Sequence, residues 1–245
     1  ESENTRSTIS NIRKMLSQAE KGGVQNTIQN CVTVLQNDPV LADSIRLNLL
    51  SERIDIVKPM GWQRSGPTLT DTDMMYILRR MEKYGLYSEK RVSAAIRIVA
   101  NENHYHPIRD YLNDLKWDGT ERISHALHHF LGAAEDELTA EALKIFLLGA
   151  IKRVFHPGCK FEMMLCLVGG QGAGKSSFFR LLAIKDEWFS DDLRRLDDDN
   201  VFRKLQGHWI MEMSEMIATA NAKSIEEIKS FLSKQKETYK IPYET

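Results

Sequence analysis

Cysteine is scarce in this sequence. The three cysteines are Cys31, Cys159 and Cys166, and no two of them have C-x-x-C spacing. An odd number of widely spaced cysteines argues against a disulfide framework. We therefore expect a reducing, cytoplasmic setting for the protein.

The sequence also lacks an excess of charge of one sign, and it lacks long apolar runs. The 33 Lys and Arg residues nearly balance the 34 Asp and Glu residues, so nucleic acid would have to bind a local basic surface. No apolar run approaches the roughly 18 residues that a membrane-spanning helix needs, and no basic-then-apolar signal segment opens the chain. We predict no membrane partner. Only 14 glycines and 6 prolines are present, which argues against long disordered tracts.

The first half of the chain has mainly helical periodicity. We interpret residues 1–25 as a polar lead segment with one short helix, and residues 26–118 as a helical N-terminal domain. Within that domain, residues 44–50 and 53–57 alternate as a β-hairpin does, and Thr70-x-x-Asp73 resembles a capping box at the start of a helix. Further helices are expected over 27–37, from Ser88, from Pro107, from Thr120 and over 139–155.

The periodicity changes in the second half, which we interpret as a nucleotide-binding domain over residues 119–245. Phe161–Val168 is a short apolar run of the type found in strands, and glycines and a helix through Ala183 follow it directly. His208–Met213 predicts a second strand, and Ser224-x-x-Glu227 resembles a capping box for a last helix. The sequence thus predicts an α/β core that follows a mainly helical domain.

A phosphate-binding loop stands between the first predicted strand and its helix. The pattern G-x-x-x-x-G-K-[ST] is met without a mismatch by Gly169, Gly170, Gln171, Gly172, Ala173, Gly174, Lys175 and Ser176, and Ser177 follows. Glycines allow positive φ angles, so that successive N–H groups can surround a phosphate. Lys175 would lie between the β- and γ-phosphates, and the Ser176 hydroxyl would bind Mg²⁺. We predict that these residues bind ATP with Mg²⁺ and that the chain is a P-loop ATPase.

Such a loop needs a carboxylate partner at the end of a neighbouring strand. Glu215 comes just after the predicted strand His208–Met213, and Glu212 lies three residues earlier. We expect Glu215 to orient the attacking water and to help hold the metal, with Glu212 as the second candidate.

Several segments together resemble the virulence-associated protein E family, which comprises replication proteins of phages and phage-derived islands and is related to superfamily 3 helicases. They are NENHYHPIRDYLNDLKWDGTERI, VFHPGCKFEMMLCLVGGQGAGKSSFFRLLA, WFSDDL and GHWIMEMSEM, within residues 100–245. The resemblance implies an AAA+-like ATPase core that assembles into rings, hexameric in a full-length protein, and acts on single-stranded or forked DNA during replication of a mobile element. It also implies that Lys175 and Ser176 are the Walker A residues and that Glu215, or else Glu212, is the Walker B acid.

The same resemblance extends to residues 228–243, which are similar to the segment that leads into the DNA-contacting hairpin of related helicases. It implies that Lys229, Lys234, Lys236 and Lys240 face DNA phosphates. Related ATPases then continue with a polar sensor strand and an arginine that reaches the neighbouring subunit. The sequence ends at Thr245 before either feature, so we expect an incomplete core and weak hydrolysis.

Two other functions stay open from the sequence. One is a small-molecule kinase, although no arginine-bearing lid follows the loop. The other is a nucleic-acid-binding interaction module with a vestigial loop. Its basic face would be formed by Arg79, Arg80, Lys83, Lys90, Arg91 and Arg97.

Overall fold

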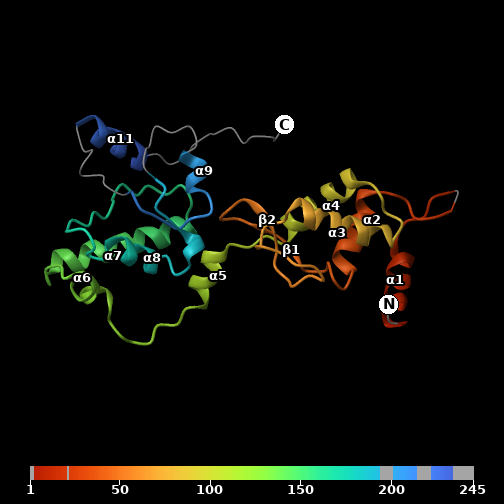
Figure 1. Cartoon of the computed structure of the whole chain (residues 1–245), viewed down its shortest axis with the longest axis horizontal. Helices are drawn as coiled ribbons and strands as arrows, with labels where there is room; N and C mark the ends of the chain where they lie inside the picture. The colour runs from red at the N-terminus through yellow and green to blue at the C-terminus, as the bar shows by residue number, and fades with distance from the viewer. Residues whose placement is uncertain (1–2, 21, 194–200, 214–221, 234–245) are drawn as a thin grey trace. The chain divides into compact units, whose positions relative to one another are not determined.

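The chain forms mainly helices in the computed structural model, which describes residues 3–20, 22–193, 201–213 and 222–233 (Figure 1). Two small two-stranded sheets accompany the helices. The chain divides into two compact units, residues 1–107 and residues 108–245, which are described separately below. No helix in the described ranges is long and apolar enough to cross a membrane.

The first unit contains four helices and a hairpin among its described residues. In chain order these are α1 (Glu3–Met15), α2 (Ile28–Asn37), β1 (Ile45–Asn48), β2 (Arg53–Ile56), α3 (Asp71–Glu82) and α4 (Glu89–Glu102). The expected helix over 27–37, the hairpin and the helix that begins after Thr70 are confirmed, and the helix after Ser88 begins at Glu89. The capping box of α3 is also confirmed, because Thr70 and Asp73 bond reciprocally.

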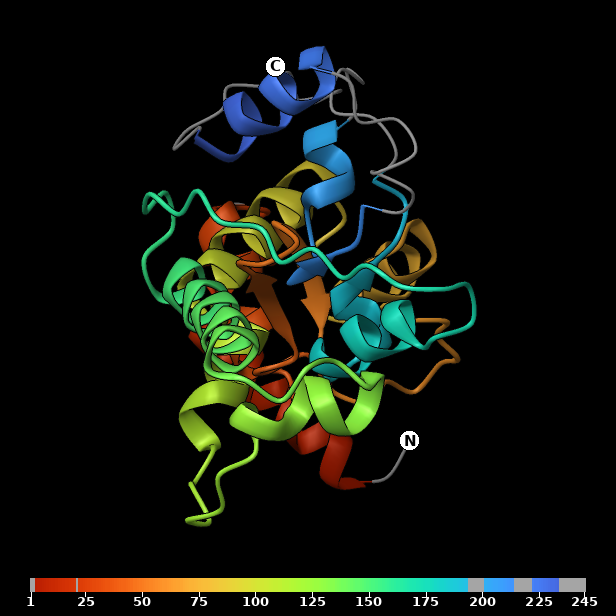
Figure 2. The ribbon, with the colours of Figure 1, turned by 90° about the vertical axis from the view of Figure 1, so that its left-hand side faces the viewer.

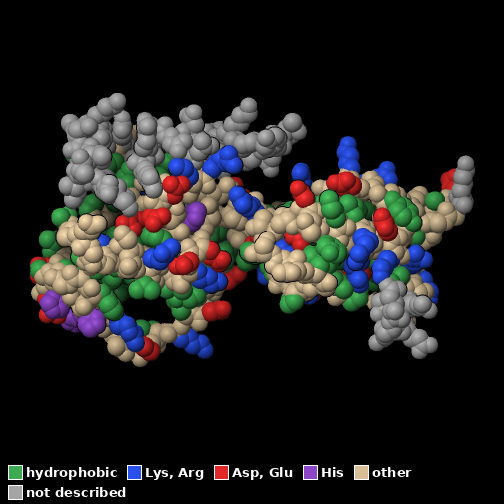
Figure 3. Space-filling view, in the orientation of Figure 1, with side chains coloured by type: hydrophobic (Ala, Val, Ile, Leu, Met, Phe, Trp, Pro, Cys, Tyr) green, Lys and Arg blue, Asp and Glu red, His purple; other side chains and the backbone are tan. Residues whose placement is uncertain are grey.

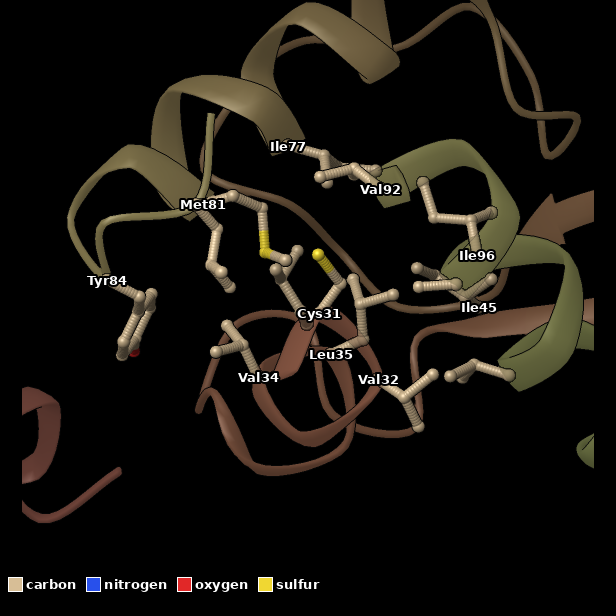
Figure 4. Packing of buried hydrophobic residues seen from close by; sticks show 14 of the residues in the cluster. Cys31, Val32, Val34, Leu35, Ile45, Ile77, Met81, Tyr84, Val92 and Ile96 are labelled. Carbon is tan, nitrogen blue, oxygen red and sulfur yellow. The ribbon is translucent and has the colours of Figure 1, made fainter. Parts of the chain in front are cut away.

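The hydrophobic core of the first unit lies where α2, α3 and α4 meet β1. Figure 4 shows Cys31 and Leu35 of α2 facing Ile77 of α3 and Val92 of α4. Tyr84, which follows α3, is fully buried in the same cluster. Ile12 of α1 belongs to it as well, so the polar lead segment contributes an apolar side to this core.

Isolated bridges occupy both outer edges of the β1–β2 hairpin. On the β1 side, the Tyr105 N–H donates to Leu47 O at 2.9 Å and Tyr105 O accepts from Leu49 N at 2.9 Å. On the β2 side, Ile56 N donates to Pro67 O and Leu69 N donates to Ile54 O, each at 2.8 Å. The two short strands are therefore held from both sides.

The second unit is built around two packed helices, α6 and α7 (Figures 1 and 2). Its elements, beginning with the helix at the boundary, are α5 (Pro107–Asp114), α6 (Ile123–Leu131), α7 (Glu137–Phe155), α8 (Lys175–Leu182), η1 (Asp186–Trp188), β3 (Phe189–Ser190), α9 (Val201–Leu205), β4 (Ile210–Met211) and α11 (Ala222–Ser233). Leu127 of α6, Leu143 of α7 and Phe178 of α8 form one small cluster of buried residues in this unit. Three starts differ from expectation: α6 begins at Ile123 rather than Thr120, α7 begins at Glu137 rather than about Thr139, and α11 begins before Ser224.

The predicted strand Phe161–Val168 is wrong, because these residues have no regular secondary structure. The second predicted strand is present only as Ile210–Met211, which pairs in parallel with Phe189–Ser190. A strand is defined by a hydrogen-bonded neighbour, and within the described residues no segment pairs with 161–168. The described residues therefore show the loop and its helix without the α/β core that the sequence predicts.

Phe161 is nevertheless held firmly against α7. A Cβ atom added at Gly149 would lie 2.2 Å from the tip of the Phe161 ring, so the ring packs directly on the backbone of the helix. Arg153 of α7 donates from its guanidinium to Phe161 O at 2.7 Å. Contacts with a helix thus take the place of strand pairing at the beginning of this apolar run.

Candidate phosphate-binding site

The loop between Gly169 and Gly174 has the backbone conformation that its glycines suggest. Gly172 and Gly174 have φ angles of +78° and +79°, in the left-handed region that glycine adopts at little cost. A Cβ atom at Gly172 would meet nothing within 4 Å, so the requirement for glycine there comes from the backbone and not from crowding. Residues 169–174 of the loop are exposed.

Lys175 folds back over the first part of this loop. Its Nζ donates to Gly169 O at 2.8 Å and to Gly170 O at 2.7 Å. Lys175 is also the first residue of α8, whose position is set by the burial of Phe178 against Leu127 and Leu143. A cation is therefore placed beside the N-terminus of a helix, where both favour an anion.

A carboxylate lies next to the serine of the motif. The Ser176 hydroxyl donates to Glu212 Oε1 at 2.7 Å, although the two residues are 36 positions apart in the sequence. Glu212 directly follows β4, and its N–H donates to Ser190 O at 2.8 Å, which extends the β3–β4 pairing by one bond. The short parallel sheet thus fixes the position of this carboxylate.

The position of β4 is fixed in turn by Trp209. Its indole N–H donates to Ala150 O of α7 at 3.2 Å, and its backbone N–H donates to Trp188 O at 2.8 Å. The rings of Trp188 and Trp209 pack edge to face at 6.3 Å. Trp209 therefore connects the carboxylate-bearing strand β4 to α7, and Trp188 packs against Trp209.

The Ser176–Glu212 pair supplies oxygen ligands of the kind that Mg²⁺ prefers. Mg²⁺ in nucleotide sites is held by one or two protein oxygens together with phosphates and water. A hydroxyl and a carboxylate oxygen separated by 2.7 Å fit that requirement. In the described part of the chain no group of three or more His, Cys, Asp and Glu side chains is placed to hold a metal.

A cavity of about 330 Å³ adjoins the loop. Its walls come from the end of α6, the turn that follows, the start of α7 and residues 165–169, and Ala173 and Lys175 close it on the side of the loop. Most of the lining side chains are apolar, and Cys166 is among them. Sequence reasoning missed this feature, since nothing in the pattern of α6 or α7 points to the loop.

The other sequence-predicted site residues are only partly described. Ser177 is exposed in the first turn of α8. Lys229 lies on α11, where its Nζ is 3.0 Å from Glu226 Oε1. Glu215, Lys234, Lys236 and Lys240 lie outside the described residues, so their predicted roles stay predictions.

The basic residues of α3 and α4 do not all face solvent freely. Arg80 Nε is 2.6 Å from Asp38 Oδ1, where Asp38 is fully buried, and Arg91 donates to Asn26 O. On the face visible in Figure 3, Lys and Arg side chains of this unit are interspersed with Asp and Glu. At least Arg80 therefore serves the packing of the unit.

A comparison with models of protein families identifies a family for this chain. The sequence model of a family described as the virulence-associated protein E-like domain matches residues 112–245, more than half of the chain. The matched region contains the loop, α8 and Glu212. No curated protein matches the chain.

Proposed function

The chain belongs to the virulence-associated protein E-like domain family, and from this premise we propose that it is a P-loop ATPase with a helicase-like role in the replication of a phage or mobile island. The observation that carries the proposal is the hydrogen bond between Ser176 and Glu212. It joins the hydroxyl of the loop motif to a carboxylate at the end of a parallel strand, which is the pairing that a metal-nucleotide site requires.

The loop binds the phosphates in this proposal. Lys175 Nζ donates to two neutral carbonyl groups, Gly169 O and Gly170 O. A phosphate oxygen is a stronger acceptor because the hydrogen bond is then charge-assisted on both sides. A nucleotide therefore draws the ammonium away from the carbonyls, and the open space at Gly172 leaves room for phosphate.

Ser176 and Glu212 hold the metal side of the site. Mg²⁺, when bound with the nucleotide, neutralises charge that develops on the phosphates. Glu215 remains the proposed residue for orienting the attacking water, with Glu212 as the alternative. A sensor and an arginine from a neighbouring subunit would complete catalysis, so we propose a homo-oligomeric ring, hexameric in the full-length protein.

DNA is the proposed partner of that ring. Lys229, Lys234, Lys236 and Lys240 supply the cations that would contact the phosphates of a single strand. Each such contact would add a counterion-release contribution, and binding would weaken steeply with salt.

Lys175→Ala tests the phosphate site. We expect calorimetry to show that the variant binds Mg-ATP at least tenfold more weakly than the unaltered chain, because a charge-assisted contact is lost. Lys144→Ala is the matched control, since Lys144 is an exposed helix lysine that pairs only with Glu141 among the contacts described. Equal affinity in the Lys175→Ala variant and the unaltered chain would exclude this loop as the site.

A second measurement tests the DNA part separately. ATP turnover is measured with and without single-stranded DNA, and we expect DNA to increase it. If Mg-ATP binds but turnover and DNA binding are both absent at low salt, the ATP site stands and the helicase-like role is wrong.

A further inference from the structure

The cavity beside the loop has apolar walls wherever they are formed by other segments of the chain. Leu127, Leu131 and Ala133 line it from α6 and the turn after it, and Leu165 and Leu167 line it from the segment before the loop. Its volume of about 330 Å³ lies at the lower end of the range for small-molecule sites, about 300–1,000 Å³. A small organic group fits such a volume.

Two of the lining side chains are apolar and yet strongly exposed. Leu138, in the first turn of α7, is 79% exposed, and Val168, immediately before the loop, is 78% exposed. Both border the same cavity as Lys175, so apolar surface and a phosphate-binding cation lie side by side. A ligand that joins an apolar ring to an anionic group would cover both at once.

A nucleoside triphosphate joins an aromatic base to an anionic chain of phosphates in this way. The loop determines which end of the nucleotide lies at Lys175. Gly169, Ala173 and Lys175 belong both to the loop and to the cavity wall. Phosphates bound at the loop therefore place the attached ribose and base within reach of the cavity. We propose, on the basis of the function proposed above, that this cavity holds the nucleoside and that it favours purines without distinguishing adenine from guanine.

The lack of discrimination follows from the chemistry of the walls. Apart from Lys175, the lining side chains with polar atoms are Thr139 and Cys166, and none carries a carboxylate or an amide. Base identity is read by hydrogen-bonding groups, whereas an apolar pocket rejects a similarly shaped ligand only weakly. A larger purine ring covers more of the apolar wall than a pyrimidine, so purines bind more tightly.

Cys166 provides a direct readout of occupancy. It is an exposed free cysteine in the cavity wall, whereas Cys31 is buried and Cys159 is half-buried outside the cavity lining. The alkylation rate of each cysteine is measured by peptide mass spectrometry with Mg-ATP, Mg-GTP, Mg-CTP or inorganic tripolyphosphate. We expect saturating ATP and GTP to slow labelling of Cys166 at least fivefold, while tripolyphosphate changes it less than twofold. Cys159 is the internal control and should not respond.

Leu138→Ser tests the apolar wall, with Leu148→Ser as the matched control because Leu148 is also an exposed leucine of α7 but does not line the cavity. We expect Leu138→Ser to weaken ATP and GTP binding about fivefold and to leave tripolyphosphate binding unchanged. Leu148→Ser should change neither affinity.

The outcomes separate the two proposals. If tripolyphosphate and ATP bind equally well and neither protects Cys166, the phosphate site stands and the nucleoside cavity is wrong. A preference above about tenfold for ATP over GTP would overturn the claim of weak discrimination. If no phosphate compound binds at all, the proposed function fails and the cavity proposal fails with it.

Discussion

Asp73 is the residue whose removal should most disturb the first unit. Its buried carboxylate accepts hydrogen bonds from Trp62 Nε1 at 2.7 Å, from Arg64 Nε at 2.8 Å and from the Thr70 N–H at 2.9 Å. One side chain therefore completes the capping box of α3 and connects this helix to the loop that follows the hairpin.

The expected cost of Asp73→Ala can be worked out from these contacts. Loss of the cap accounts for about 1 kcal/mol. Loss of the buried partner of Arg64 accounts for about 2–3 kcal/mol, which is less than for a fully isolated charge because Arg64 still donates to Ile56 O and Pro67 O. We expect a total loss of about 3–4 kcal/mol in the free energy of unfolding of this unit. Asp71→Ala, in the exposed first turn of the same helix, should cost about 0.5 kcal/mol.

The assay should report on the first unit alone. Hydrogen exchange of peptides from α2 and α4, followed as urea is raised, serves this purpose, and the Asp73→Ala midpoint should fall by about 2 M. A loss no larger than that of Asp71→Ala would refute the reasoning, because the carboxylate would then contribute nothing beyond an exposed charge.

The effect of pH gives a second check on Asp73. Burial alone would raise the pKa of its carboxyl, but hydrogen bonds from Arg64, Trp62 and Thr70 outweigh burial and hold the pKa well below its ordinary value. A lowered folded-state pKa stabilises the protein above the unfolded pKa of about 3.9, and this stabilisation is lost as the pH falls below it. The stability difference between the unaltered chain and Asp73→Asn should therefore shrink between about pH 5 and pH 2, and a difference that is constant over this range would contradict the assignment.

Two further predictions concern the second unit. Glu212→Gln keeps an acceptor for Ser176 but removes the charge, so Mg²⁺ should increase ATP affinity much less than in the unaltered chain. Calorimetry with and without Mg²⁺ would show at least a tenfold smaller gain, and an unchanged gain would exclude Glu212 as a metal ligand. Gly149→Ala should destabilise the unit by about 1–3 kcal/mol in thermal unfolding, because the new methyl group would overlap the Phe161 ring. In a Phe161→Ala background the same change should stabilise α7 by up to about 1 kcal/mol, and the absence of this sign reversal would contradict the packing.

Local rules predicted the first unit well. The Thr70–Asp73 box and the alternation on either side of Ser51 are contained in a few consecutive residues, so they can be read without tertiary information. The other bonds of Asp73 could not be predicted in this way. Its contacts to Trp62 and Arg64 depend on how the loop after β2 returns to α3.

The second unit was harder because its elements depend on distant partners. Residues 161–168 have the composition of a strand, but pairing decides whether a strand forms. The choice between Glu212 and Glu215 likewise depends on where β4 ends and which residue of β3 it pairs with. The sequence offered both carboxylates, and the described structure places Glu212 beside Ser176. The cavity could not be predicted from the sequence, because its walls come from segments that only the fold brings together.

The occupied edges of the β1–β2 hairpin have a consequence for how copies of this protein can meet. A bare two-stranded ribbon offers outward-facing amides and carbonyls that can template a strand from another molecule, which is a route to aggregation. Here Tyr105 and Thr68 occupy the two sides, and Tyr105 is secured further by its hydroxyl, which donates to Asp55 Oδ2 at 2.7 Å. Intermolecular β-extension at this hairpin would first have to displace these residues, so we expect any oligomer of the first unit to form through its other surfaces.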